Sequence, residues 1–227
     1  MSVAEPVGSI PVGGQDNVRH LIVLGHPDAH SFNHAIAARY AESARENFHE
    51  VELRDLYAMG FDPLLRSNER PDHRPSEPAA DVEAELALIE TSDVITFVYP
   101  LWFGSPPAIV KGYIDRVFGA AFGFDDLKLG GRPGLFTGKM LSLFTSSATS
   151  RSWLDEQGLM TSLRQSQGAY LEQLFGFAQG AYFHADQVVG DLSSARAEEI
   201  LFAVSEKTRE VCALAGAARH RRDQSSD

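Results

Sequence analysis

The sequence predicts an α/β fold in which a five-stranded, mostly parallel sheet carries helices on both faces. Short continuous apolar runs, which are typical of strands buried on both faces, alternate along the chain with segments of helical periodicity. The 227 residues and their 44% apolar content also suffice for one sizeable core. Strands separated by helical crossovers run parallel, so the alternation itself favours this architecture.

The first half of the predicted sheet begins with residues 20–25, an apolar run that ends in a glycine. A helix is predicted over 33–47, because its apolar residues share one face and Asn33 can cap its start. Residues 49–56 alternate like a strand nearer an edge. The next segment, 57–80, contains four prolines. We expect a long irregular connection there, which in a compact domain is usually functional or an interface arm.

The middle of the chain supplies the second fully buried strand, 93–100, after a short helix at 81–91. Apolar residues at helical spacing predict another helix over 105–118. Ser105 is expected to cap this helix, with the two following prolines tolerated in its first turn. Large apolar side chains and a glycine separate the strand from the helix, in a turn where solvent is expected.

The last third of the domain adds two strands. Residues 139–147 are predicted as a buried strand that ends in hydroxyl side chains, and 181–189 as a further core strand. Helices are predicted over 162–176 and 194–216, the latter with Gly216 at its C-cap. Five strands in this order favour a flavodoxin-like doubly wound fold. Its ligand is expected at the carboxyl ends of the strands, near the switch in strand order.

Composition sets the expected domain boundaries. Residues 19–216 are predicted as one flavodoxin-like domain, with a disordered leader over 1–18 and a disordered polar tail over 217–227. The start has no positive segment followed by an apolar one, so no secretory signal is expected. No apolar run is long enough to span a bilayer, and a cytoplasmic location is the default expectation.

Charge and cysteine content argue against several functions. A net charge of −11 and a pI of about 5.1 argue against a nucleic-acid partner, because proteins that bind nucleic acids present a basic surface to them. The single cysteine, Cys212, excludes an intramolecular disulfide and a zinc cluster built of cysteines, and we expect a small packed side chain.

No metal site is predicted from the histidines, because they lack metal-ligand spacing and no third ligand is evident for His30 and His34, which lie four residues apart. Those in polar segments are His30, His34, His49 and His73. His184, near the end of a strand, is expected to be structural, with a cofactor-facing position as the alternative. Asp125 and Asp126 are expected to form a turn.

The first turn at the expected ligand edge reads GHPDAHSFNHA over 25–35. Ser31, Phe32 and Asn33 lie at the start of the helix, where unpaired N–H groups and the helix dipole favour an anion. Backbone N–H groups, the Ser31 hydroxyl and the Asn33 amide can hold a phosphate there without a cation. The alternative is an ordinary Ser or Asn cap beside two surface histidines.

The second turn, YPLWFGSPP over 99–107, suits a flat heteroaromatic ring. Its main-chain groups would face the ring edge, Trp102 and Phe103 would supply apolar walls, and Gly104 lets the backbone approach closely. The alternative is a buried hydrophobic corner or the core of a dimer contact. The third turn, 144–150, places small hydroxyl residues at the matching strand end, where they can hydrogen-bond the same ring.

One turn thus suits a phosphate, one a planar apolar ring and one a polar ring edge. This combination fits a flavin nucleotide better than a nicotinamide dinucleotide, because the chain has no GxGxxG fingerprint and no Walker lysine at these turns. The cofactor and a second subunit would then shield Leu101, Trp102 and Phe103 from solvent.

The chain also carries HP…SFN over 26–33, DLY over 55–57 and YPLWFGSPPAIVKGYIDRVF over 99–118. These motifs resemble the flavin-dependent NAD(P)H dehydrogenase (quinone) family, which includes quinone reductases and the ancillary oxidoreductases of potassium efflux systems. The resemblance covers roughly residues 19–215. It implies a homodimer with FAD or FMN at the interface and NAD(P)H as the reductant.

The resemblance also implies which residues contact the flavin. The phosphate and ribityl end would contact His26, Ser31, Phe32 and Asn33. The isoalloxazine ring would be lined by Pro100, Leu101, Trp102, Phe103 and Gly104. The family's Thr-Gly-Gly loop corresponds to Thr145, Ser146 and Ser147. Two serines therefore replace two glycines, and 148–160 lack the Tyr and His that serve the reduced flavin in some quinone reductases, with Trp153 near the Tyr position.

The activity implied by the resemblance is two-electron transfer of a hydride from NAD(P)H through the flavin to a quinone or similar acceptor, with ping-pong kinetics and no side-chain nucleophile. Two other classes stay open. One is a flavin-binding regulatory subunit of a membrane transporter with little turnover, which the departures at 146–160 favour. The other is a flavodoxin-type electron carrier. A response regulator is set aside, because the first strand ends in GHP and not in a pair of carboxylates.

Overall fold

The computed structural model describes residues 17–70, 78–122 and 134–224. Five parallel strands form one sheet in the order β2-β1-β3-β4-β5. In chain order the strands are β1 Arg19–Leu24, β2 Glu50–Asp55, β3 Val94–Pro100, β4 Met140–Ser146 and β5 Ala178–Ala185. The strand order reverses between β1 and β3, so the predicted flavodoxin-like doubly wound fold is confirmed.

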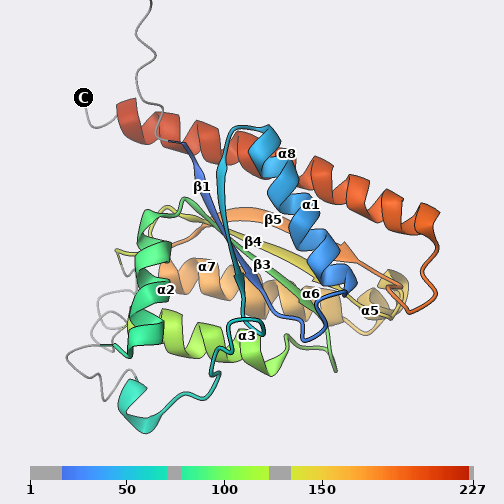
Figure 1. Cartoon of the computed structure of the whole chain (residues 1–227), viewed down its shortest axis with the longest axis horizontal. Helices are drawn as coiled ribbons and strands as arrows, with labels where there is room; N and C mark the ends of the chain where they lie inside the picture. Colours follow the sequence, from blue (N-terminus) through green and yellow to red (C-terminus); the bar gives the residue numbers. More distant parts are fainter. Residues whose placement is uncertain (1–16, 71–77, 123–133, 225–227) are drawn as a thin grey trace, which may run out of the picture.

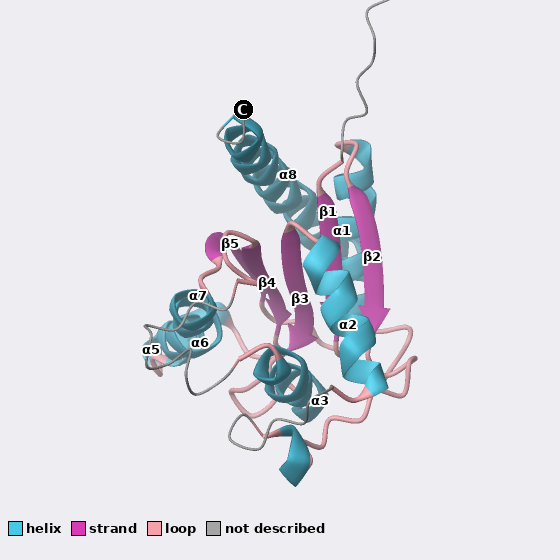
Figure 2. Cartoon of the chain, turned by 90° about the vertical axis from the view of Figure 1, so that its left-hand side faces the viewer, coloured by secondary structure: helices cyan, strands magenta, loops and turns pink. Residues whose placement is uncertain are grey.

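Helices cover both faces of the sheet (Figures 1 and 2). One face is covered by α1 Phe32–Glu46 and α8 Ser194–Gln224. The other is covered by α2 Ala80–Thr91, α3 Ala108–Tyr113 with the π-helical turn Ile114–Phe118, and α7 Tyr170–Phe175. Because side chains alternate along a strand, β1 contributes Leu21 and Val23 to one core and Ile22 and Leu24 to the other.

Two helix starts differ from the prediction. Ser31, not Asn33, is the N-cap of α1, and its Oγ accepts a hydrogen bond from the backbone N–H of His34. Ser105 does not cap α3, which starts after the second of the two prolines. The reason is that two backbone hydrogen bonds hold Ser105 against Trp102 in a tight turn.

The helix predicted over 162–176 is longer and interrupted in the structure. The segment consists of α5 Arg151–Glu156, α6 Leu159–Leu163, the π-helical turn Arg164–Ala169 and then α7. A Cβ on Gly168 would come within 2.3 Å of the Tyr182 hydroxyl, so this glycine permits close packing against β5. The strand predicted over 181–189 is shifted, since β5 ends at Ala185.

Both predicted ends of the domain move outward. Val18, expected in the leader, is buried in the core, while residues 1–16 lie outside the described part of the chain. The helix end predicted at Gly216 is wrong, because α8 continues to Gln224. Arg219 and Arg222 in this extension bond the carboxylate of Asp93, at 2.8 and 2.7 Å, which fixes the helix against the start of β3.

The connection predicted over 57–80 is irregular where the structure describes it, apart from the short helix Ser67–Glu69. The buried guanidinium of Arg116 holds it in place, bonding Glu69 and Asp81 at 2.6 Å each. Among the described residues, no helix combines the length and apolar character needed to cross a membrane.

Candidate functional site

The first turn joins the end of β1 to α1, and its polar side chains form a hydrogen-bonded relay. Ser31 Oγ lies 2.8 Å from His34 Nδ1, and His34 Nε2 lies 2.9 Å from Asp55 Oδ2 at the end of β2. A carboxylate accepts, so His34 donates through Nε2, and in the neutral ring Nδ1 accepts a hydrogen bond from the Ser31 hydroxyl. The relay orients the Ser31 hydroxyl at the N-terminus of a 15-residue helix, where an anion is favoured.

Asn33 sits in the first turn of α1 but faces the interior. It is 3% exposed, and its amide Nδ2 donates to Ser146 Oγ at 3.0 Å while its Oδ1 accepts from the same hydroxyl at 3.2 Å. The side-chain amide therefore links the first turn to the third, and its hydrogen-bonding groups are engaged within the protein.

The second turn presents two aromatic side chains to solvent. Trp102 and Ser105 exchange backbone hydrogen bonds of 3.0 and 3.1 Å across a two-residue loop. The loop residues Phe103 and Gly104 have φ values of 51° and 74°. Gly104 adopts such a value freely, whereas a bulky residue does so only under strain. Phe103 is fully exposed and Trp102 is 41% exposed, so a large apolar surface stands open at the edge of the sheet.

All three turns contact one another. Leu101 N–H of the second turn donates to Ser146 O of the third at 2.7 Å. The ring of His26, in the first turn, packs edge-on against that of Trp102 with centroids 5.7 Å apart. With the bonds between Asn33 and Ser146, every pair of turns is joined directly. The structure thus brings together the residues that the sequence assigned to separate loops.

The third turn holds two buried hydroxyl residues, Thr145 and Ser147, against an imidazole. His184 of β5 has Nδ1 2.9 Å from Thr145 Oγ1 and Nε2 3.1 Å from Ser147 Oγ. Ser147 donates its own proton to Thr149 O, so His184 Nε2–H donates to Ser147. The Thr145 hydroxyl lies within hydrogen-bond distance of both Phe183 O, at 3.2 Å, and His184 Nδ1, and its one proton serves these two acceptors. Burial lowers the pKa of His184 to about 4, which keeps the ring neutral at pH 7.

A cavity of about 300 Å³ opens beside the third turn. It lies between the ends of β3 to β5 and the segment from α5 to the π-helical turn at 164–169. Thr145 and His184 line it from the sheet, and Arg151 and Arg164 line it from the helical side. The Arg164 guanidinium stacks over the ring of Tyr182, 5.4 Å from its centroid.

The cavity residues Arg151, Arg164 and Tyr182 and the contacts of His184 were not predicted from the sequence. Their one signal in the sequence is that Arg151 directly follows the hydroxyl-rich third turn, which places it near the expected ligand edge. Arg164 and Tyr182 come together only because a π-helical turn and a strand pack side by side.

The remaining predicted residues take ordinary positions at the site. Phe32 packs against the core shared by α1 and α8. Pro100, the last residue of β3, pairs in register with Ser146. Burial lowers the pKa of His26, whose Nδ1 accepts from the backbone of Asp28. The predicted turn at 125–126 and His73 lie outside the described residues.

Comparison with known proteins agrees with this architecture. A family model described as a flavodoxin-like fold matches residues 18–208. An uncharacterized NAD(P)H oxidoreductase of Haemophilus influenzae is 36% identical over 147 residues, which cover 64% of this chain and 72% of that protein. Rat NAD(P)H dehydrogenase (quinone) 1 is 31% identical over 158 residues, which cover 62% of this chain and 57% of that protein. The match therefore spans a little over half of the rat protein.

Solved structures share the fold. An NAD(P)H:quinone oxidoreductase from Methanothermobacter marburgensis superposes with a TM-score of 0.74 at 24% identity, covering 85% of this chain and 98% of that one. An FMN-dependent NADH-azoreductase from Bacillus anthracis, in complex with FMN, gives a TM-score of 0.63 at 16% identity, covering 86% of this chain and 99% of that one.

Proposed function

The chain belongs to the flavodoxin-like family that includes NAD(P)H oxidoreductases and quinone dehydrogenases, and we propose that it is a flavoprotein NAD(P)H dehydrogenase of the quinone type. It would bind FAD or FMN, take a hydride from NAD(P)H and reduce a quinone or similar acceptor by two electrons. The similarity to the Haemophilus and rat proteins supports the reaction class.

One observation carries this proposal: the three turns meet at the carboxyl ends of the strands. Contacts of Asn33 with Ser146, Leu101 with Ser146, and His26 with Trp102 join them in pairs. Ligands of doubly wound sheets bind at this edge.

The residues at this edge fit a phosphorylated flavin. The α1 N-terminus and the Ser31 hydroxyl suit the phosphate, because both can donate hydrogen bonds to an anion. The exposed rings of Trp102 and Phe103 suit the faces of a planar tricycle. The amide of Asn33 is engaged by Ser146, so we propose that Asn33 supports the phosphate site from behind and not by side-chain contact.

When bound, the flavin supplies two-electron hydride chemistry. The chain's own residues would bind the flavin, orient it and shield its ring from water. The Ser31 hydroxyl and the α1 N-terminus would hold the phosphate, and Trp102 and Phe103 would exclude water from the flavin ring. NAD(P)H and the acceptor would occupy the same position in turn, which predicts ping-pong kinetics. His184 is neutral at pH 7 and holds the hydroxyl of Ser147 in place through its Nε2–H.

We propose a homodimer that covers the second turn. A fully exposed Phe103, held with a φ of 51°, is costly unless a partner buries it. A second subunit seated on this turn would remove both Trp102 and Phe103 from water.

The experiment that tests the function begins with the purified full chain. Bound cofactor is released and identified by mass and absorbance, and the protein is then assayed for NADH and NADPH oxidation with a quinone. A yellow protein with quinone-dependent turnover is the expected result. Protein that stays colourless after soaking in FAD and in FMN would refute the proposal.

A second candidate rests on the third turn. Thr145, Ser146 and Ser147 are buried and bonded within the protein, and the segment after them forms α5 with no tyrosine or histidine. A flavin-binding regulatory subunit of a membrane transporter, with little turnover, would suit such a site. Quinone reduction at ordinary enzymatic rates by the isolated protein would argue against this candidate.

A further inference from the structure

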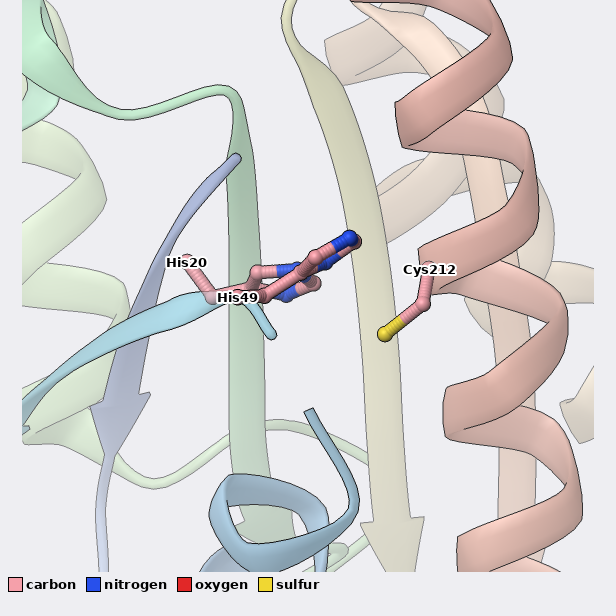
Figure 3. Close-up of side chains that lie close together, drawn as sticks. All are labelled: His20, His49 and Cys212. Carbon is pink, nitrogen blue, oxygen red and sulfur yellow. The ribbon is translucent and has the colours of Figure 1, made fainter. Parts of the chain in front are cut away.

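Two histidines and the cysteine meet away from the three turns, at the opposite end of the sheet. His20 lies at the start of β1, His49 just before β2, and Cys212 in α8. One potential ligand atom from each lies within 4.8 Å of the other two. In Figure 3 the thiol of Cys212 reaches from α8 toward the two imidazole rings.

We propose that His20, His49 and Cys212 bind one Zn²⁺ ion per chain. Two imidazole nitrogens and one thiolate sulfur are ligands that Zn²⁺ favours. His20 and Cys212, at 1% and 4% exposure, would hold the ion from the interior. His49 is only partly buried, so water can reach a fourth position from its side. Zinc sites with three protein ligands commonly complete a tetrahedron with water.

The distances need only small shifts to accept the ion. His20 Nε2 and His49 Nδ1 lie 2.8 Å apart. Two Zn–N bonds of about 2.0–2.1 Å in a tetrahedron separate their nitrogens by roughly 3.3 Å, so the rings must part by about 0.5 Å. The ion would then take the place of the hydrogen bond that now joins the rings. A Zn–S bond of about 2.3 Å places the sulfur roughly 3.6 Å from each nitrogen, so from a separation within 4.8 Å it would move inward by about 1.2 Å at most.

A second layer of hydrogen bonds already orients His20. Its Nδ1 lies 2.8 Å from the hydroxyl of the fully buried Tyr40, which accepts from Thr96 Oγ1 at 2.9 Å. Histidine ligands of metals usually bond an outer partner through the second ring nitrogen, which fixes the ring and directs the free nitrogen at the ion. This arrangement directs His20 Nε2 toward His49.

The backbone before β2 places His49 in the cluster. Phe48, the second residue after α1, has a φ of 62°, an uncommon conformation for a bulky residue, while its side chain is exposed. Hydrogen bonds fix the backbone of the next two residues: His49 N–H donates to Ala44 O at 3.1 Å, and Glu50 N–H donates to Val18 O at 2.9 Å. The exposed side chain of Phe48 does not pack in the core, but its backbone conformation turns the chain so that His49 lies beside His20.

The test uses the full chain, freed of metal by a chelator and titrated with Zn²⁺ alone. We expect one equivalent to bind. Co²⁺ at the same site should give the thiolate-to-cobalt charge-transfer absorption, which Cys212→Ser abolishes. His49→Gln should weaken Zn²⁺ binding roughly 100-fold, and Tyr40→Phe, which keeps the ring but loses the outer hydrogen bond, about 10-fold.

His220→Gln is the matched control, because His220 is an exposed histidine on the same helix as Cys212. It should leave Zn²⁺ binding unchanged. Cys212→Ala accompanies Cys212→Ser so that the result does not depend on one variant folding, and circular dichroism checks each fold. Failure of the native chain to bind Zn²⁺, or equal binding by the native chain and the Cys212 and His49 variants, overturns the proposal. Flavin binding is measured separately and has no bearing on this outcome.

Discussion

Asn33 and Ser146 exchange two hydrogen bonds, one from the amide Nδ2 at 3.0 Å and one to its Oδ1 at 3.2 Å. The first residue lies in α1 and the second ends β4, so the pair ties together two turns that are 113 positions apart. By the resemblance, Ser146 would stand at a glycine of the family's Thr-Gly-Gly loop, and a glycine has no side chain for this bond.

The first prediction concerns this link. Asn33→Ala and Ser146→Ala should each lower the free energy of unfolding by about 1–3 kcal/mol, because each leaves a buried polar group without its partner. The double variant should lose less than the sum of the two. Urea denaturation of the four proteins gives the coupling energy. Strictly additive losses would show that the two side chains do not interact.

Ser31 tests the phosphate site more cleanly than Asn33, whose truncation also breaks the link to Ser146. Ser31→Ala should weaken FMN binding roughly 10-fold, because a hydrogen bond to a charged oxygen is lost. Riboflavin, which has no phosphate, is the matched ligand and should bind the variant and the native chain equally. Fluorescence titration measures both affinities. An equal loss for the two ligands would place Ser31 away from the phosphate.

The proposed dimer predicts that Phe103→Ala weakens dimerisation without destabilising the subunit. The fully exposed side chain makes no core contacts, so the stability of the subunit should change by no more than about 0.5 kcal/mol. Sedimentation velocity should show a shift from dimer to monomer. Phe48→Ala is the control, since Phe48 is also an exposed phenylalanine with positive φ, on a different edge. An unchanged dimer in Phe103→Ala would contradict the proposed interface.

His184 predicts a loss of stability in acid. Burial lowers its pKa from 6.5 to about 4, so between these values the unfolded chain binds a proton that the folded chain does not. Its contribution is fully present above pH 6.5 and falls on the order of 3 kcal/mol as the pH drops to 4. Chemical denaturation across this range should show a shallower decline in His184→Gln. Parallel curves for the two proteins would rule the contribution out.

Much of the fold could be predicted because hydrophobic periodicity is local. The run at 20–25 corresponds to β1 and that at 93–100 to β3, each within one residue at either end. The predicted ends of elements were wrong where contacts with residues distant in the sequence determine where a helix stops. Gly216 is a good C-cap in isolation, yet α8 continues because Arg219 and Arg222 meet Asp93. The π-helical turn Arg164–Ala169 was also missed, and its Gly168 lies against Tyr182 of β5, a residue distant in the sequence.

The alternation of strands and helices can be read from the amino-acid sequence alone, and with it the three turns that share one edge of the sheet. The way those turns are joined, the entry of His184 into the third turn and the approach of Cys212 to His20 and His49 emerge only when the chain is folded. The difference lies in the distance along the chain over which each interaction acts. Periodicity and turn chemistry act over a few residues, whereas a hydrogen bond or a set of metal ligands needs atoms brought within a few ångströms by packing of the whole sheet.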